Sequence, residues 1–91
     1  MPEVRKNPEA GRYELVEEGR TIAIADYVER GDAVVFPHTE VVAPLRGQGY
    51  GEQLVRAALD DLRSTGRHVV PACWFVAEFI GEHDEYRDLV A

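Results

Sequence analysis

Cysteine and long apolar runs are almost absent from this chain of 91 residues, and both absences narrow its possible roles. Cys73 is the only cysteine, so no internal disulfide can form and no Cys/His spacing suits zinc. The three histidines, His38, His68 and His83, are too dispersed to predict a metal site. No apolar run approaches the roughly 20 residues that cross a bilayer, and residues 1–11 contain no apolar signal segment. These features predict a reduced, cytoplasmic protein that holds no metal.

Positive charge is also scarce. Ten Lys and Arg residues stand against 17 Asp and Glu residues, and the net charge of −7 argues against binding to nucleic acid or to an anionic membrane. Even so, Arg46, Arg56, Arg63 and Arg67 all lie in or after one glycine-rich segment, which predicts a local site for phosphate. The acidic remainder of the chain favours a cationic ligand such as an amine.

Length and composition predict one small globular domain over residues 1–91. Hydrophobic residues make up 45% of the chain and charged residues 30%, which is the balance of a folded protein. A chain of this size buries roughly 60 to 65% of the surface that its unfolded state exposes. No internal repeat, linker or low-complexity segment divides it.

Short segments that alternate polar and apolar residues fill the first half of the chain. This alternation is typical of half-buried strands, and the glycine-containing turns between them predict an antiparallel meander. The predicted strands cover residues 4–6, 12–17, 21–28 and 33–36, and the last one resumes over residues 39–42. Because Pro37 cannot donate a ladder hydrogen bond, we expect a bulge or bend near Pro37 and His38. Such a break frees backbone groups that a ligand can use.

The second half of the chain predicts two helices and one more strand. Residues 48–64 place an apolar stripe at helical spacing, and Gly66 supplies a stop. Residues 67–71 predict a short strand, which should run parallel to the strand before Arg46 because it returns after a helix. Residues 73–80 predict a mostly apolar helix ending at Gly81, and residues 83–90 add a helical turn or two. The predicted fold class is α+β, a mixed sheet of antiparallel meander plus one parallel crossover, with helices packed on it.

A glycine-rich turn, Arg46-Gly47-Gln48-Gly49-Tyr50-Gly51, leads into the first helix. Glycines let backbone N–H groups approach a ligand, and the free N–H groups at a helix N-terminus carry partial positive charge. The turn therefore predicts a phosphate or pyrophosphate ligand. No Lys follows the glycines as a Walker loop requires, and Glu52 stands where a dinucleotide fingerprint needs glycine. On the glycines alone, a connection without any ligand stays equally open.

The pattern Arg46-x-x-Gly49-x-Gly51 after a strand resembles the acyl-CoA pyrophosphate loop of the GNAT superfamily of N-acetyltransferases. The order of predicted elements is also similar to the GNAT fold. Residues 7–11 form a turn where the usual pair of helices follows the first strand, and the extra C-terminal strands are missing. The shortened chain, together with the motifs at residues 38–41 and 70–73, resembles the minimal single-domain branch of the superfamily. The resemblance covers residues 4–86.

The resemblance implies acetyl-CoA (coenzyme A) as the cofactor. Two parallel strands that splay at their ends would form a V-shaped slot for it. Backbone groups of Val41 and Val42 would pair with the pantetheine arm like an added strand. The thioester would then end near residues 38–40 on one strand and near Cys73 on the next. The implied residues around the diphosphate are Arg46, Gly47, Gln48, Gly49, Tyr50 and Gly51.

Three side chains are candidates for the chemistry. Cys73 lies where a strand ends and a helix begins, which favours thiolate or acid chemistry, although a free cysteine is commonly a buried apolar residue. His38 suits a general base, because imidazole titrates near neutrality, and Glu40 is the alternative base. The competing interpretations are a structural histidine and a solvated carboxylate. A covalent acetyl-cysteine would give ping-pong kinetics, whereas direct amine attack, the usual GNAT route, would leave Cys73 to protonate the CoA thiolate.

Other aromatic and acidic residues have simpler predicted roles. Tyr50, Trp74, Phe75 and Phe79 are predicted core residues, although Phe75, Phe79 and the nearby Glu78 could also line the slot. The acidic residues predicted to be solvated are Glu14, Glu17, Glu18, Glu29, Asp60 and Asp61.

Two functions stay open on this sequence. An acetyl-CoA-dependent N-acetyltransferase would move an acetyl group to an amine of a small molecule or protein. The alternative is a CoA-binding module with little or no turnover, because the missing helical pair leaves an open acceptor surface. A protein-binding domain ranks third. The expected state is a monomer or weak homodimer that binds neither nucleic acid nor membranes.

Overall fold

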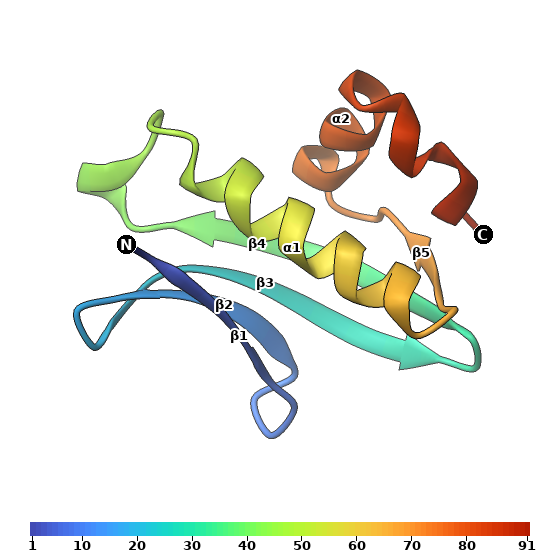
Figure 1. The fold of residues 1–91 in the computed structure, drawn as a ribbon, viewed down its shortest axis with the longest axis horizontal. Helices are drawn as coiled ribbons and strands as arrows, with labels where there is room; N and C mark the ends of the chain where they lie inside the picture. Colours follow the sequence, from blue (N-terminus) through green and yellow to red (C-terminus); the bar gives the residue numbers. More distant parts are fainter.

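One five-stranded sheet organises the computed structural model, which describes all residues 1–91 (Figure 1). The strands are β1 (Glu3–Asn7), β2 (Arg12–Glu17), β3 (Arg20–Arg30), β4 (Ala33–Val41) and β5 (His68–Val70). They lie in this order, antiparallel except for the parallel pair of β4 and β5. The helical elements are η1 (Ala43–Leu45), α1 (Tyr50–Ser64), α2 (Trp74–Glu82) and η2 (Asp84–Leu89). The predicted α+β fold, an antiparallel meander with one parallel crossover, is confirmed.

The core lies between the sheet and α1, with α2 packed beside α1 (Figure 1). On the sheet side, Leu15 and Ala25 have no exposed area, and Val76 and Phe79 of α2 join the same buried cluster. The predicted apolar stripe of α1 is at most 2% exposed and consists of Leu54, Val55, Ala58, Leu59 and Leu62. No helix of this structure has the length and apolar character that crossing a bilayer requires.

β4 carries the predicted irregularity. Between the cross-strand pairs Asp26–His38 and Val28–Val35, β4 contains one residue more than β3. Pro37 lies in this bulge, as expected from its missing N–H group. The strand nevertheless continues without a break on both sides of the bulge.

Both helices begin later than predicted. α1 begins at Tyr50 rather than at residue 48, because its N-cap Gly49 has a left-handed φ of 85°. Cys73 is likewise the extended N-cap of α2 and not its first residue. α2 also continues one residue past the predicted end at Gly81, to Glu82.

Glu14 is buried, so its prediction as a solvated residue is wrong. Its side chain accepts hydrogen bonds from Arg12 Nε at 2.8 Å and from Asn7 Nδ2 at 3.1 Å, and Arg5 Nε lies 4.0 Å away. The hydrogen bond from Arg12, followed by that from Asn7, lowers the pKa of the Glu14 carboxyl below its ordinary range. Because Asn7 and Arg5 belong to β1, the carboxylate ties β1 to β2.

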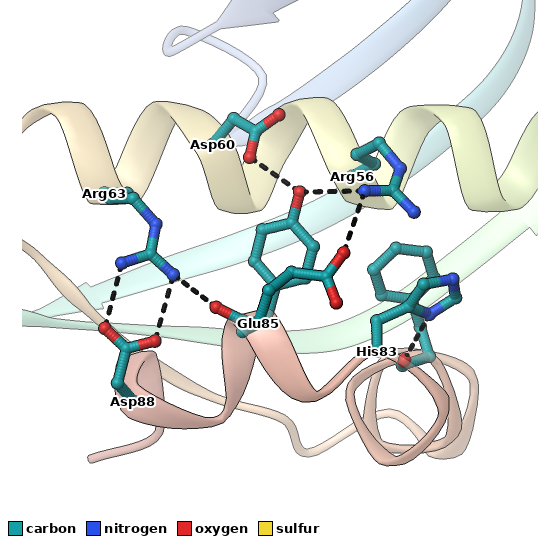
Figure 2. A network of polar contacts seen from close by, with 8 residues as sticks. Arg56, Asp60, Arg63, His83, Glu85 and Asp88 are labelled. Atoms are coloured by element: carbon teal, nitrogen blue, oxygen red, sulfur yellow. Dashed lines mark hydrogen bonds and ion pairs between the residues drawn. The ribbon is translucent and has the colours of Figure 1, made fainter.

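A polar network holds η2 against α1 (Figure 2). Arg63 donates to both carboxylate oxygens of Asp88, each at 2.9 Å. Arg56 donates to the hydroxyl of Tyr86 at 3.2 Å, and this hydroxyl donates to Asp60 at 2.7 Å. Two arginines predicted for a phosphate site therefore stabilise the C-terminal segment instead.

We expect Glu14→Gln to lower the free energy of unfolding at neutral pH by roughly 1 to 2 kcal/mol, because it removes the charge from two part-buried hydrogen bonds. The folded-state pKa of Glu14 lies below the unfolded value. Its stabilisation is therefore complete above the ordinary carboxyl range and is lost as pH falls through the folded-state pKa. Urea unfolding at neutral pH and at about pH 3 measures both effects.

The difference between variant and wild type should shrink at acid pH. Glu78→Gln is the matched control, because Glu78 is exposed on α2 and should change stability little. A Glu14→Gln difference that stayed constant down to acid pH would contradict the ion-pair account.

Candidate functional site

A cavity of about 590 Å³ lies beside the C-terminal half of β4. Its wall also includes the loop from η1 into α1 and the first residues of α2. The lining contains these predicted site residues: His38, Glu40, Val41, Arg46, Gly47, Gly49, Tyr50 and Gly51. Cys73, Val42 and Gln48 are not part of it.

The cavity exists because β4 and β5 separate. Their parallel pairing ends at Val35 and Val70. The next carbonyl of β4, that of Phe36, accepts a hydrogen bond from the Cys73 N–H at 2.8 Å, at the start of α2. Beyond this point, residues 38–41 pair with β3 on one side, and their other edge borders the cavity. A backbone edge without a neighbouring strand can accept an extended ligand by strand addition.

This free edge ends before Val42. The Val42 N–H donates to the Ile22 carbonyl at 2.9 Å, and the Val42 carbonyl accepts from the Leu45 N–H at 2.9 Å. Arg46 Nε donates to the Val41 carbonyl at 3.0 Å. The expected pairing of a ligand with Val42 therefore finds no free N–H group, and the available edge is shorter than the sequence implied.

Two glycines of the loop before α1 have left-handed backbone conformations. Gly47 and Gly49 have left-handed φ angles of 80° and 85°. No atom lies within 4 Å of the place that a Cβ would take at either residue, so conformation rather than crowding requires glycine. No side chain caps α1 at Gly49. The first N–H groups of α1, at the positive end of its dipole, are therefore available to a ligand.

Arg46 is the one arginine of the predicted phosphate group that lines the cavity. Arg67, which was also predicted there, instead donates to the Gly31 carbonyl at 3.0 Å and lies 3.8 Å from Glu29. The sequence could not show which arginines reach the cavity, because that depends on hydrogen-bond partners that are distant in the sequence.

His38 and Glu40 form a pair in the cavity wall. His38 Nε2 and Glu40 Oε1 are 3.0 Å apart, and both side chains are about half exposed, at 53% and 55%. They lie on the same side of β4, because residues two apart in a strand share a face. A carboxylate that holds one imidazole nitrogen orients the ring. His38 and Glu40, which the sequence offered as alternative candidates for a general base, therefore contact each other.

Cys73 has a different environment. It is 8% exposed and belongs to the buried core cluster. Its backbone N–H reaches the Phe36 carbonyl, but its side chain does not line the cavity. Cys73 therefore does not share the cavity lining with the pair formed by His38 and Glu40.

Aromatic residues at the cavity correct another prediction. Trp74 is 72% exposed and is not a core residue, whereas Phe79 is 3% exposed and is one. Tyr50 and Phe75 are half-buried and line the cavity together with Trp74. Thr39, within the range 38–40 expected near the thioester, also lines it, and so do Leu45 and Glu52, which were not predicted. Their positions next to predicted residues were the only indication in the sequence.

Sequence comparison points to one family. The profile of the GCN5-related N-acetyl-transferase family matches residues 12–89. Protein NATD1 of Bos taurus is 32% identical over 65 residues, which make up 70% of this chain and 56% of the bovine protein. The chain thus spans little more than half the length of that relative.

Two solved structures share the fold. The solution structure of a GCN5-like protein from Staphylococcus aureus has a TM-score of 0.75 at 22% identity, covering 98% of this chain and 87% of that one. The ribosomal-protein-S18-alanine N-acetyltransferase from Escherichia coli has a TM-score of 0.64 at 23% identity, covering 78% of this chain and 48% of that one. At these identities the similarity concerns the fold.

A five-stranded mixed sheet with one parallel pair and helices packed on it defines an α+β fold that both solved structures share. The family match over residues 12–89 is decisive within this fold. The chain belongs to the GCN5-related N-acetyltransferase (GNAT) family, and the predicted membership is confirmed.

Gly51 lets α1 lie close to α2 beside the cavity. A Cβ on Gly51 would lie 2.7 Å from Cζ of Phe75, so the ring of Phe75 fills the space of the missing side chain. We expect Gly51→Ala to lower the free energy of unfolding by roughly 1 kcal/mol, at the low end for overpacking, because Cζ is the outer end of a half-buried ring that can move toward the cavity. Thermal and urea unfolding measure this loss.

The double variant Gly51→Ala/Phe75→Leu tests the mechanism, because the shorter side chain makes room for the new methyl group. The effect of Gly51→Ala should be smaller in the Phe75→Leu background than in wild type. Additive effects of the two substitutions would show that Phe75 does not explain the glycine.

Proposed function

We propose that this chain is an acetyl-CoA-dependent N-acetyltransferase that acetylates an amine, with residues 1–91 acting as one domain. The observation that carries the proposal is the free edge of β4 over residues 38–41, which borders one cavity with the glycine loop and the start of α1. A cavity of about 590 Å³ has the size of a small-molecule site. The family membership supports the reaction class.

The loop fits the diphosphate of acetyl-CoA. Gly47 and Gly49 have left-handed backbone conformations that glycine adopts without strain, and they carry no Cβ beside the backbone amides. The first N–H groups of α1 have no side-chain cap and lie next to this loop. Arg46 adds the positive charge. Its guanidinium donates to the Val41 carbonyl through Nε, which leaves its other N–H groups for phosphate oxygens.

The free edge of β4 fits the pantetheine arm. An extended amide chain that pairs with residues 38–41 would take the place of the strand that β5 does not supply. We assign this contact to residues up to Val41 and not to Val42, whose N–H group is already paired. When bound, acetyl-CoA supplies an acetyl group that is activated as a thioester.

His38 and Glu40 are the proposed proton acceptors. The attacking amine must lose a proton, and the imidazole of His38 at the cavity wall can take it. Glu40, 3.0 Å from His38 Nε2, orients the ring and stabilises the imidazolium that forms. Glu40 is therefore a positioning residue for His38.

Direct attack of the amine suits this geometry better than a covalent acetyl-cysteine. Cys73 is buried and does not line the cavity, so we assign it a packing role at the start of α2. Mass spectrometry after incubation with acetyl-CoA distinguishes the routes. An unmodified chain is expected, and an acetyl group on Cys73 would establish the two-step route instead.

We expect His38→Gln to lower kcat for acetyl transfer about 100-fold or more and Glu40→Gln to lower it about tenfold, with unchanged affinity for acetyl-CoA. Thiol release from acetyl-CoA across a panel of amines measures turnover, and isothermal titration measures affinity. His68→Gln is the control, because His68 lies at β5 and pairs with Asp32 at 3.8 Å.

Three results would each contradict a different part of the proposal: the base, the turnover or the binding of CoA. Full activity in His38→Gln would remove the assigned base. Binding of acetyl-CoA without turnover on any amine would favour the CoA-binding module. A wild-type chain that binds neither CoA nor acetyl-CoA would exclude both functions.

A further inference from the structure

Thr39 carries a hydroxyl group that no other group of the protein pairs. Its Oγ1 atom is buried and has no hydrogen-bond partner, although Thr39 belongs to the lining of the cavity. A buried hydroxyl without a partner costs free energy, because its hydrogen bonds to water are lost and none replaces them. Most buried polar groups are paired, so an exception in a cavity wall points to a ligand that supplies the partner.

The side chain of Thr39 points to the covered face of the sheet, which is the face on which α1 packs. Thr39 lies opposite Ala25 of β3, which has no exposed area, and side chains of opposite residues share a face. The neighbours of Thr39 in the strand, His38 and Glu40, point to the other face. The unpaired hydroxyl and the proposed base therefore border the cavity from opposite faces of one strand.

The backbone of Thr39 is also free on the side of the cavity. In an antiparallel pair, every second residue turns its N–H and C=O groups toward the partner strand, and the residues between turn theirs away. Because the Val42 N–H donates to Ile22 after β3 begins, the backbone groups of Thr39 turn toward the free edge. The Val41 carbonyl turns the same way and accepts from Arg46 Nε. Of residues 38–41, Thr39 alone thus offers both of its backbone groups to a ligand.

An extended chain of amides matches these three groups of Thr39. The backbone N–H and C=O can pair with such a chain as with an added strand, and the hydroxyl can donate to an amide carbonyl on the covered face. A phosphate has acceptor oxygens only, so it would meet the Thr39 carbonyl without a hydrogen to share. In acetyl-CoA the pantetheine arm is the part that contains amides.

We propose that Thr39 fixes the register of the pantetheine arm on β4, with its hydroxyl donating a hydrogen bond to an amide carbonyl of the arm. The inference rests on the proposed binding of acetyl-CoA and adds a side chain to the contacts assigned there. Register matters because a shift by one residue along a strand moves a ligand by about 3.3 Å, which would carry the thioester away from His38. Thr39 is therefore a positioning residue.

Thr39→Val tests the inference, because it replaces the hydroxyl by a methyl group of similar size. The melting temperature of the free chain should rise by about 4 °C, since an unpaired hydroxyl is no longer buried. The Kd for CoA, measured by isothermal titration, should rise about five- to tenfold, since one hydrogen bond to the ligand is lost. A residue with a merely structural role would not combine higher stability with weaker binding. Thr39→Ser keeps the hydroxyl and should keep the Kd within about twofold of wild type.

A shortened ligand and a matched control locate the effect. The ligand 3′-phospho-ADP is CoA without the pantetheine arm, so Thr39→Val should leave its Kd within about twofold of wild type. Thr21→Val makes the same chemical change at an exposed position of β3 and should leave the Kd for CoA unchanged.

An unchanged Kd for CoA in Thr39→Val would overturn the inference and leave CoA binding intact. A lower melting temperature would overturn it as well, because the hydroxyl would then be paired in the free chain. So would an equal loss of affinity for CoA and for 3′-phospho-ADP, which would show a general disturbance of the site. Absence of CoA binding to wild type would overturn both the proposed function and this inference.

Discussion

β4 and β5 pair only as far as Val35 and Val70, and then they part. The bulge at Pro37 and the hydrogen bond from the Cys73 N–H to the Phe36 carbonyl fix this separation, because both redirect backbone groups that would otherwise continue the ladder. The free edge, the cavity and the placement of α2 all follow from it. A sheet that stayed paired over the full length of β4 would have no space for an extended ligand.

The second constraint is the approach of α1 to α2. Gly47 and Gly49 are needed for their left-handed backbone, whereas Gly51 is needed because the ring of Phe75 occupies the place of its side chain. The glycines of this one motif are thus required for two different physical reasons. The polar network from Arg63 to Asp88 then holds η2 against α1, so the helix that carries the loop is supported along its length (Figure 2).

Much of the fold follows from local patterns in the sequence. Alternation predicted the strands, helical spacing predicted the buried stripe of α1, and the missing N–H group of Pro37 predicted the bulge. The environment of single side chains did not follow, because it depends on partners distant in sequence. Glu14 is buried by arginines on two strands, and Trp74 is exposed despite its apolar side chain. The loop of the site could be predicted, but the loss of Val42 from the free edge depends on Ile22, which lies 20 positions away.

The central claim is that one ligand occupies the loop and the free edge of β4 together. An amide NMR titration of the isotope-labelled chain with CoA tests it most directly, because each backbone N–H group reports its own environment. The account predicts the largest shift changes at residues 47–51 and 38–41, with little change in β1 and β2. Changes confined to another surface, or none at saturating CoA, would contradict it.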